Sequence, residues 1–206
     1  AKGVNSNVEY TVREDQLDGY EASSWTGDCS ADGKITLKSG ENKTCTITNS
    51  DIAPKLKLVK KVVNDNGGNK EARDWTLTAT GDGGFDDKGD STIFHTVKAG
   101  VEYNLKESDV AGYAFNGWEC DGGLLNDSVI KLGLAENVTC TVTNDDISPT
   151  LEIIKEVIND NGGNATVNKF NITLTDTDLD FDSGVVDGTK TTYTAKPTVV
   201  ANKKYT

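Results

Sequence analysis

The chain has 206 residues, a formal net charge of −12 and a hydrophobic content of 35%, and it contains no methionine. The acidic balance argues against nucleic-acid binding, because phosphate recognition needs clustered Lys and Arg side chains. No segment is long and apolar enough to span a membrane, and no signal peptide is visible. Ala1 in place of Met is what we expect of a mature or excised segment. The mixed charges and frequent β-formers predict a folded chain.

Residues 1–54 have the pattern of the back half of a β domain. Residues 8–14 alternate as a strand, and further strands are expected at 34–37 and 44–49. The short linker that follows ends at Pro54, and a proline at such a joint ends a strand or stiffens the connection. We therefore predict the C-terminal half of a β-sandwich repeat here.

Residues 55–150 repeat the strand pattern of residues 1–54 and precede it with the strands of a front half. An aliphatic strand at 56–63 leads into the turn Asn64-Asp65-Asn66-Gly67-Gly68, whose residue types suit positive φ. The remaining strands are expected at 75–80, 92–97, 101–107 and 138–144. The last two repeat the pattern of 8–14 and 43–49. This segment is predicted to be a complete β-sandwich repeat.

Residues 151–206 repeat only the front half. The strand and turn of 56–68 return at 151–163, including an unchanged Asn-Asp-Asn-Gly-Gly. A strand at 170–175, an acidic insertion and a strand-forming stretch at 191–206 follow. Short strands, frequent turn signals and no helical periodicity indicate an all-β chain of tandem β-sandwich domains.

The two incomplete segments are complementary. Joining Tyr205 and Thr206 to Ala1 gives a sequence that parallels 94–107. A half-sandwich alone exposes a strand edge and an open core, so it should not be stable by itself. We therefore expect 151–206 to be completed by 1–54 of the next repeat or subunit, either in a longer tandem array or between subunits of a fibre.

The four cysteines form two local pairs, Cys29 with Cys45 and Cys120 with Cys140. No CxxC motif is present and His95 is the only histidine, which argues against zinc. Two disulfides, each contributing about 3 kcal/mol in the chain-entropy model, would place the chain in an oxidising, extracellular compartment. The alternative is two pairs of reduced, buried thiols.

Three polar residues of the middle segment are expected on the same strand faces as the apolar core residues. Lys60 lies on the face of Leu56 and Leu58, and Glu107 and Asn144 lie on the inward faces of their own strands. Burying a lysine costs several kcal/mol unless it is paired, neutralised or consumed. The same pattern is repeated by Glu14, Asn49 and Lys155 in the outer segments.

At these residues the chain resembles the prealbumin-like B-type repeat domains of bacterial collagen adhesins and pilus shafts, the Cna B-type and SpaA-like family. The shared motifs are a Leu-x-Leu-x-Lys opening strand, Tyr-x-Leu-x-Glu followed by Gly-Tyr, and a closing strand that ends in Asn. The resemblance implies Ig-like (prealbumin-like) sandwiches and an isopeptide bond from Lys60 to Asn144, assisted by Glu107. It implies a second cross-link from Lys155 to Asn49, assisted by Glu14, in the next repeat or subunit.

The chemistry of such a bond is physically reasonable. Desolvation lowers the pKa of a lysine and raises the pKa of a glutamic acid, which leaves a nucleophilic amine beside an acid that can polarise an amide. The reaction occurs once per domain, so it is autocatalytic cross-linking and not turnover by an enzyme. Two alternatives stay open. One is an unreacted Lys–Glu ion pair with Asn nearby, and the other is a Lys60 side chain that reaches out to solvent.

Two weaker signals concern the surface. Alternating acids could hold calcium, although a solvated acidic edge strand explains them as well; they are Asp176, Asp178, Asp180 and Asp182. No other cofactor is indicated. Five Asn-x-Ser/Thr triplets are compatible with glycosylation; they begin at Asn42, Asn126, Asn137, Asn164 and Asn171.

These patterns favour a structural repeat of an extracellular, cell-surface fibre, stalk or pilus, with other copies or adjacent repeats as partners. An adhesin domain that binds a host protein or glycan through its loops is the alternative. A secreted enzyme has little support, since no Ser-His-Asp triad, phosphate-binding loop or metalloprotease motif is present.

Overall fold

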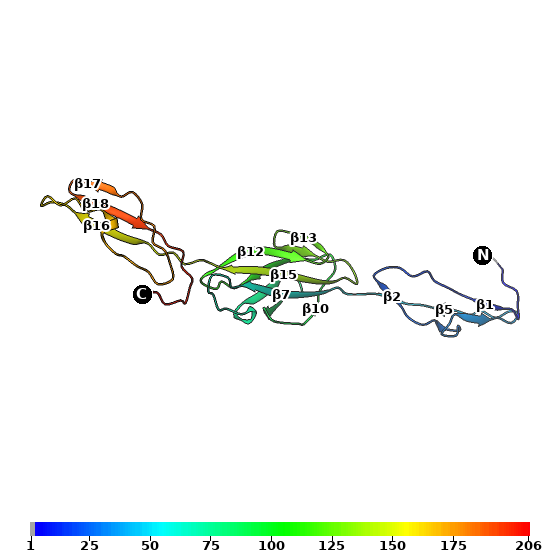
Figure 1. The fold of residues 1–206 in the computed structure, drawn as a ribbon. Coiled ribbons are helices and arrows are strands. Elements are labelled where there is room, and N and C mark those ends of the chain that lie inside the picture. Colours follow the sequence, from blue (N-terminus) through cyan, green and yellow to red (C-terminus); the bar gives the residue numbers. More distant parts are fainter. Residues whose placement is uncertain (1–2) are drawn as a thin grey trace.

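The structure is a computed structural model that describes residues 3–206 (Figure 1). Three parts follow one another along the molecule: an N-terminal part (3–54), a middle domain (55–150) and a C-terminal part (151–206). Ala1 and Lys2, which follow Thr206 in the end-to-end joining of the sequence, lie outside the described residues. No helix within 3–206 has the length and apolar character needed to cross a membrane.

The middle domain is a sandwich of two β-sheets. One sheet has the order β10-β7-β15-β12 and the other has the order β13-β14-β11-β8-β9. The first sheet contains β7 (Lys55–Val63), β10 (His95–Thr96), β12 (Tyr113–Cys120) and β15 (Asn137–Asp146). The second contains β8 (Thr76–Thr80), β9 (Phe85–Lys88), β11 (Glu102–Glu107), β13 (Leu124–Asn126) and β14 (Val129–Lys131). A short 3-10 helix, η1 (Ala72–Asp74), precedes β8. The all-β fold class is thus confirmed.

The two central strands of the first sheet are the first and the last strands of the domain. β7 and β15 pair in parallel, from Lys55 opposite Asn137 to Val63 opposite Asp145. All other strand pairs of the domain are antiparallel. Alternation along these strands sends every second side chain into the space between the sheets. The buried apolar residues there are Leu56, Leu58, Trp75, Leu77, Ala79, Val97, Tyr103, Leu105, Trp118, Ile130, Leu132, Val138, Cys140 and Val142.

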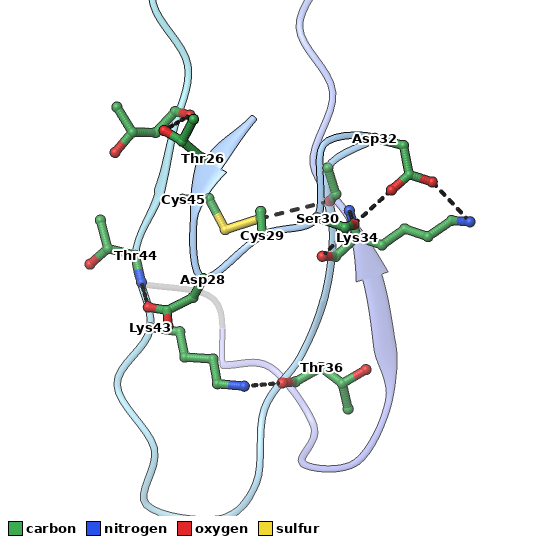
Figure 2. The surroundings of a disulfide bond; sticks show 12 residues. Thr26, Asp28, Cys29, Ser30, Asp32, Lys34, Thr36, Lys43, Thr44 and Cys45 are labelled. Carbon is green, nitrogen blue, oxygen red and sulfur yellow. Dashed lines mark hydrogen bonds and ion pairs between the residues drawn. A yellow bond between two sulfur atoms is a disulfide. The ribbon is translucent and has the colours of Figure 1, made fainter. Parts of the chain in front are cut away.

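Both disulfides are present. Cys120 and Cys140 lie directly opposite each other on β12 and β15, so their bond ties two neighbouring strands. Cys29 and Cys45 are joined in the N-terminal part, where they close a loop with a sequence separation of 16 (Figure 2). Beside that bond, the carboxylate of Asp28 accepts a hydrogen bond from the backbone N–H of Thr44 at 2.8 Å.

The N-terminal part consists of three separate two-stranded ribbons. They pair β1 (Glu9–Thr11) with β4 (Lys34–Thr36), β2 (Tyr20–Ala22) with β6 (Asn49–Asp51), and β3 (Thr26–Gly27) with β5 (Cys45–Thr46). The strand expected at 44–49 is thus broken in two. Its counterpart β15 is held between β7 and β12, whereas this stretch has a partner strand on one side only. Apart from Pro54 at the joint with the middle domain, the buried apolar side chains among residues 3–54 are those of Cys29 and Ile35.

The C-terminal part is a three-stranded sheet with a small core. Its order is β16 (Ile153–Ile158), β18 (Lys190–Ala195) and β17 (Val185–Asp187), and η2 (Val167–Lys169) packs beside it. Val157, Val167 and Tyr193 form the core. The strand expected at 170–175 is wrong, since only an isolated bridge between Leu174 and Thr177 forms there. In the middle domain the corresponding β8 has partner strands on both sides, and this stretch has neither.

The two ends of the chain carry the same turn. In the middle domain the backbone N–H of Lys98 donates to the Tyr103 hydroxyl at 2.9 Å. Asn5 donates in the same way to Tyr10 at 2.7 Å, and Val200 donates to Tyr205 at 2.8 Å. Tyr205 therefore has the role of Tyr103, and not the role of Phe94 that the end-to-end joining implied. Residues 200–206 and 5–11 are counterparts of the same stretch.

Candidate functional site

Lys60 lies inside the middle domain. Its position on β7 faces the space between the sheets, the residue is only 5% exposed, and its Nζ lies 4.7 Å from the centre of the Trp75 ring. This placement excludes the alternative in which the lysine reaches out to solvent. A cation over an aromatic face is favourable, but it does not replace the hydration that the amine has lost.

Glu107 connects Lys60 to Asn144. It ends β11 in the opposite sheet, and its Oε2 accepts a hydrogen bond from Lys60 Nζ. Its Oε1 accepts a hydrogen bond from Asn144 Nδ2 at 2.8 Å. Asn144 lies on β15 and is 3% exposed. The structure therefore brings the three residues together around one carboxylate.

The electrostatics of this cluster favour a reactive amine. Burial lowers the pKa of Lys60 below its ordinary value of 10.5, although the hydrogen bond and charge of Glu107 oppose that shift. Among the described residues, Asn144 Oδ1 is a buried oxygen without a hydrogen-bond partner. An acceptor left without a donor in a dry core is costly, and it is available to a proton donor during a reaction.

The outer parts hold the remaining predicted residues separately. In the N-terminal part Asn49 Nδ2 donates a hydrogen bond to Glu14 Oε1 on the exposed surface. In the C-terminal part Lys155 is half-buried, with its Nζ 4.1 Å from the centre of the Phe170 ring. These two parts lie at opposite ends of the molecule, so a single chain does not bring Lys155 to Glu14 and Asn49 (Figure 1).

Asp146 is a structural residue that lies two positions beyond the strand expected at 138–144. It is 6% exposed, and its carboxylate accepts hydrogen bonds from the backbone N–H groups of Asp65 at 3.0 Å, Asn66 at 3.0 Å and Gly68 at 2.5 Å. Burial opposes ionisation, yet these N–H donors hold the pKa of Asp146 below 3.8. The signal that could have revealed it is an Asp two residues after the closing Asn in both copies, at Asp51 and Asp146.

The predicted calcium ligands do not gather around one point. Asp182 Oδ1 instead accepts backbone N–H groups from Gly184 at 3.0 Å and Thr194 at 3.1 Å, and Asp176 pairs with Lys203 at 3.3 Å. All four predicted ligands, Asp176, Asp178, Asp180 and Asp182, are exposed. The one acidic triad found within 3–206 consists of Asp65, Asp145 and Asp146, and Asp146 already binds the turn.

The five predicted glycosylation triplets all begin at exposed residues. These are Asn42, Asn126, Asn137, Asn164 and Asn171. Their exposure is compatible with modification, which stays a prediction.

Fold and site together define an all-β sandwich repeat with a lysine, a glutamate and an asparagine in contact inside its core. A family model described as "Prealbumin-like fold domain" matches residues 2–47 and 51–142, and the chain belongs to this family. The family expected from the sequence is thereby confirmed. No curated protein matches the chain. Among solved structures, the chain is similar to the major pilin protein (T3.2) from Streptococcus pyogenes serotype GAS13637. The sequence identity is 15% and the TM-score is 0.35, and the match covers 68% of this chain and 66% of the pilin.

Proposed function

We propose that the chain is a structural repeat of an extracellular surface fibre, stalk or pilus, stiffened by its disulfides and by an isopeptide bond between Lys60 and Asn144. The observation that carries the proposal is that both side chains bind the same Glu107 carboxylate in a dry core. Two further features support it. The chain belongs to the prealbumin-like family, and its three parts are arranged in a row (Figure 1).

The bond forms in a single event. A proton passes from the Lys60 ammonium to Glu107, because burial destabilises the charged form of the lysine. The neutral amine attacks Cγ of Asn144, and protonated Glu107 stabilises the charge that develops on Oδ1 once the amide has turned that oxygen toward it. The new C–N bond replaces the Cγ–Nδ2 bond. Glu107 passes its proton to the departing nitrogen and takes up the second proton of the attacking amine, and ammonia leaves.

The reaction uses up its own side chains, because Lys60 and Asn144 become the cross-link. Each domain can react once, so Glu107 assists one cross-link and does not support turnover of a substrate. The cluster is buried, which leaves no route for an external substrate to the amine. This supports a structural role for the cluster and not the role of an enzyme active site.

Intact-mass analysis of the reduced protein tests the proposal. The single-chain species of the wild type is expected to be lighter than its sequence by one ammonia, and a tryptic peptide should link Lys60 to Asn144. Glu107→Gln is expected to retain the full sequence mass, because glutamine cannot accept the lysine proton. Lys88→Met, which changes a lysine hydrogen-bonded to Thr76 outside the cluster, should still lose ammonia. A wild-type mass equal to the sequence mass would refute the bond.

A further inference from the structure

The N-terminal part contains two members of the reactive cluster and lacks the third. Glu14 and Asn49 are hydrogen-bonded to each other, as Glu107 and Asn144 are in the middle domain. They border a cavity of about 110 Å³ that is also lined by apolar side chains. These include Leu17, Ala22, Trp25 and Ile47. Among residues 3–206, no lysine lines this cavity.

The C-terminal part contains the missing member. Lys155 lies over Phe170, at the position that Lys60 occupies over Trp75 in the middle domain. Within residues 3–206, no carboxylate is close enough to Lys155 to form an ion pair. One part therefore has the acid and the amide without an amine, and the other has the amine without the acid and the amide.

The turn after the opening strand gives a second, independent match. In both copies its first Asn side chain donates to a backbone carbonyl, Asn64 to Lys70 at 3.0 Å and Asn159 to Ala165 at 3.1 Å. The φ of Gly162 is +85°, against +88° at Gly67. The turn at 159–163 thus shares a side-chain hydrogen bond and a left-handed glycine with the turn that Asp146 stabilises in the middle domain.

The carboxylate that would stabilise this turn lies in the other part. Asp51 is the counterpart of Asp146 and ends β6, where it is exposed. Asp146 by contrast is buried against the turn of its own domain. The chain therefore presents a preformed turn without its carboxylate at one end, and the carboxylate without its turn at the other.

The sheet edges match as well. In the middle domain β15 pairs with β12 on one side and with β7 on the other. In the N-terminal part, β5 pairs only with β3 and β6 pairs only with β2, and β3 and β2 correspond to β12 of the middle domain. In the C-terminal part, β16 pairs only with β18. The edges left over are those that pair in parallel in the middle domain. An unpaired strand edge is a template for another strand.

We propose that residues 151–206 of one copy of the chain and residues 3–54 of a second copy form one composite sandwich domain. In it, β16 adds in parallel to β5 and β6, with Lys155 opposite Ile47 and Val157 opposite Asn49, by the register of the middle domain. The turn at 159–163 binds Asp51 of the second copy. The two parts lie at opposite ends of the molecule, so the contact is head-to-tail and leads to an open filament (Figure 1).

The overlap between the chain ends fixes which residues move. Residues 200–206 and 5–11 are counterparts, so only one of these stretches can occupy the shared strand position. The stretch that stays is the one followed by Glu14, because Glu14 belongs to the cluster. Residues 200–206 of the other copy must leave. The contacts that they give up include the hydrogen bonds between Thr206 and Thr175 and those that Ala201 and Asn202 donate to the carbonyls of Asn66 and Gly67.

Cross-linking of the composite domain rests on the proposed function, whereas the association does not. Lys155 Nζ attacks Cγ of Asn49 in the second copy, and the new C–N bond replaces the Cγ–Nδ2 bond of Asn49. Glu14 takes the proton from the amine and returns it to the departing nitrogen. Ammonia leaves, and nothing is oxidised or reduced.

Two full-length variants test this proposal in one mixture. Lys155→Met keeps the acceptor end, and the double variant Glu14→Gln with Asn49→Ala keeps the donor end. Each should remain a single chain on a denaturing gel. Their mixture should give a dimer and no larger species, with a tryptic peptide that links Lys155 to Asn49. The wild type should give a ladder, and the exposed-lysine control Lys169→Met should give the same ladder as the wild type.

Sedimentation velocity separates the two proposals. Wild-type chain is expected to associate, and Asp51→Ala should weaken that association at least tenfold while Asp18→Ala leaves it unchanged. A chain that stays monomeric at high concentration overturns the composite domain, whatever the mass of the middle domain shows. Association that depends on Asp51 without a covalent ladder supports the composite domain and overturns only its cross-link. The mass of Lys155→Met separately reports the Lys60–Asn144 bond.

Discussion

Asn144 and Asp146 are buried on the same face of β15, and each binds a different segment of the chain. Asn144 contacts Glu107 in the core, and Asp146 holds the turn that follows β7. One short stretch of β15 therefore fixes both the cluster and the turn. Because the backbone ladder between β7 and β15 already aligns these strands, the two side chains add contacts without requiring further ordering of the backbone.

Replacing Asp146 should loosen the turn. Asp146→Asn exchanges a carboxylate that accepts several backbone N–H groups for an amide with one accepting oxygen. We expect lower thermal stability and faster amide exchange at Asp65, Asn66 and Gly68. Asp145→Asn, at the neighbouring residue, is the control and should affect these amides less.

Asp146 should also make the domain sensitive to acid. Its pKa is lower in the folded protein than its ordinary value of 3.8, so its contribution to stability is complete above that value. The contribution is lost as the pH falls through the lower pKa of the folded state. Unfolding followed by circular dichroism across this range should show the loss in the wild type. An equally steep loss in Asp146→Asn would assign the acid sensitivity to other groups.

Blocking the proposed bond should reveal a titrating lysine. In Glu107→Gln the amine of Lys60 remains, and burial lowers its pKa below 10.5. The folded state then binds fewer protons than the unfolded state between the two pKa values, so the free energy of unfolding should rise with pH across that window. Urea denaturation from neutral to alkaline pH measures this slope.

The matched control is the double variant Glu107→Gln with Lys60→Met, which has no amine at this position and should lose the slope. The wild type should lack it too, because an amide nitrogen does not titrate. A wild type with the same alkaline slope as Glu107→Gln would show that Lys60 is still an amine.

The Tyr103 hydroxyl should contribute measurably to stability. It donates to the carbonyl of Asp82 at 2.6 Å and accepts from the backbone N–H of Lys98 at 2.9 Å, within a fully buried side chain. Tyr103→Phe leaves both backbone groups without a partner, so we expect a loss of about 1–3 kcal/mol in the free energy of unfolding. Tyr10→Phe removes the equivalent hydroxyl at an exposed site and should cost less. Equal losses would contradict the role of burial.

Reduction of the Cys120–Cys140 bond should destabilise the middle domain without unfolding it. Its sequence separation is 20, and a loop of this size corresponds to about 3 kcal/mol in the chain-entropy model. The two residues also remain opposite each other in the antiparallel register. Chemical denaturation with and without reductant measures the difference. The variant Cys120→Ala with Cys140→Ala should be insensitive to reductant in this domain.

The parity of side chains along strands was enough to locate the cluster. Lys60 alternates with Leu56 and Leu58, and such a position in a strand with one buried face points into the core. Glu107 and Asn144 follow from the same rule in their own strands. The rule holds here because β7, β11 and β15 are all central strands, paired on both sides.

The rest depended on tertiary context. β12 was not predicted, since its register shifts between Phe115 and Trp118 and its side chains do not alternate regularly. The hairpin of β13 and β14 turns at Asp127, whose φ of +52° is uncommon for a non-glycine residue. The expected strand at 170–175 failed because no neighbouring strand pairs with it. Local propensity does not determine a strand without partners.

The parallel pairing of β7 and β15 has a mechanical consequence. The chain enters the middle domain at Lys55 and leaves it after Asp146, at opposite ends of the same strand pair. Tension applied to the two linkers therefore loads β7 against β15 in shear, so that many backbone hydrogen bonds must rupture together. A covalent bond from Lys60 to Asn144 would carry the load directly from one strand to the other. Residues 61–143 would then bear no tension and could not unfold to lengthen the fibre.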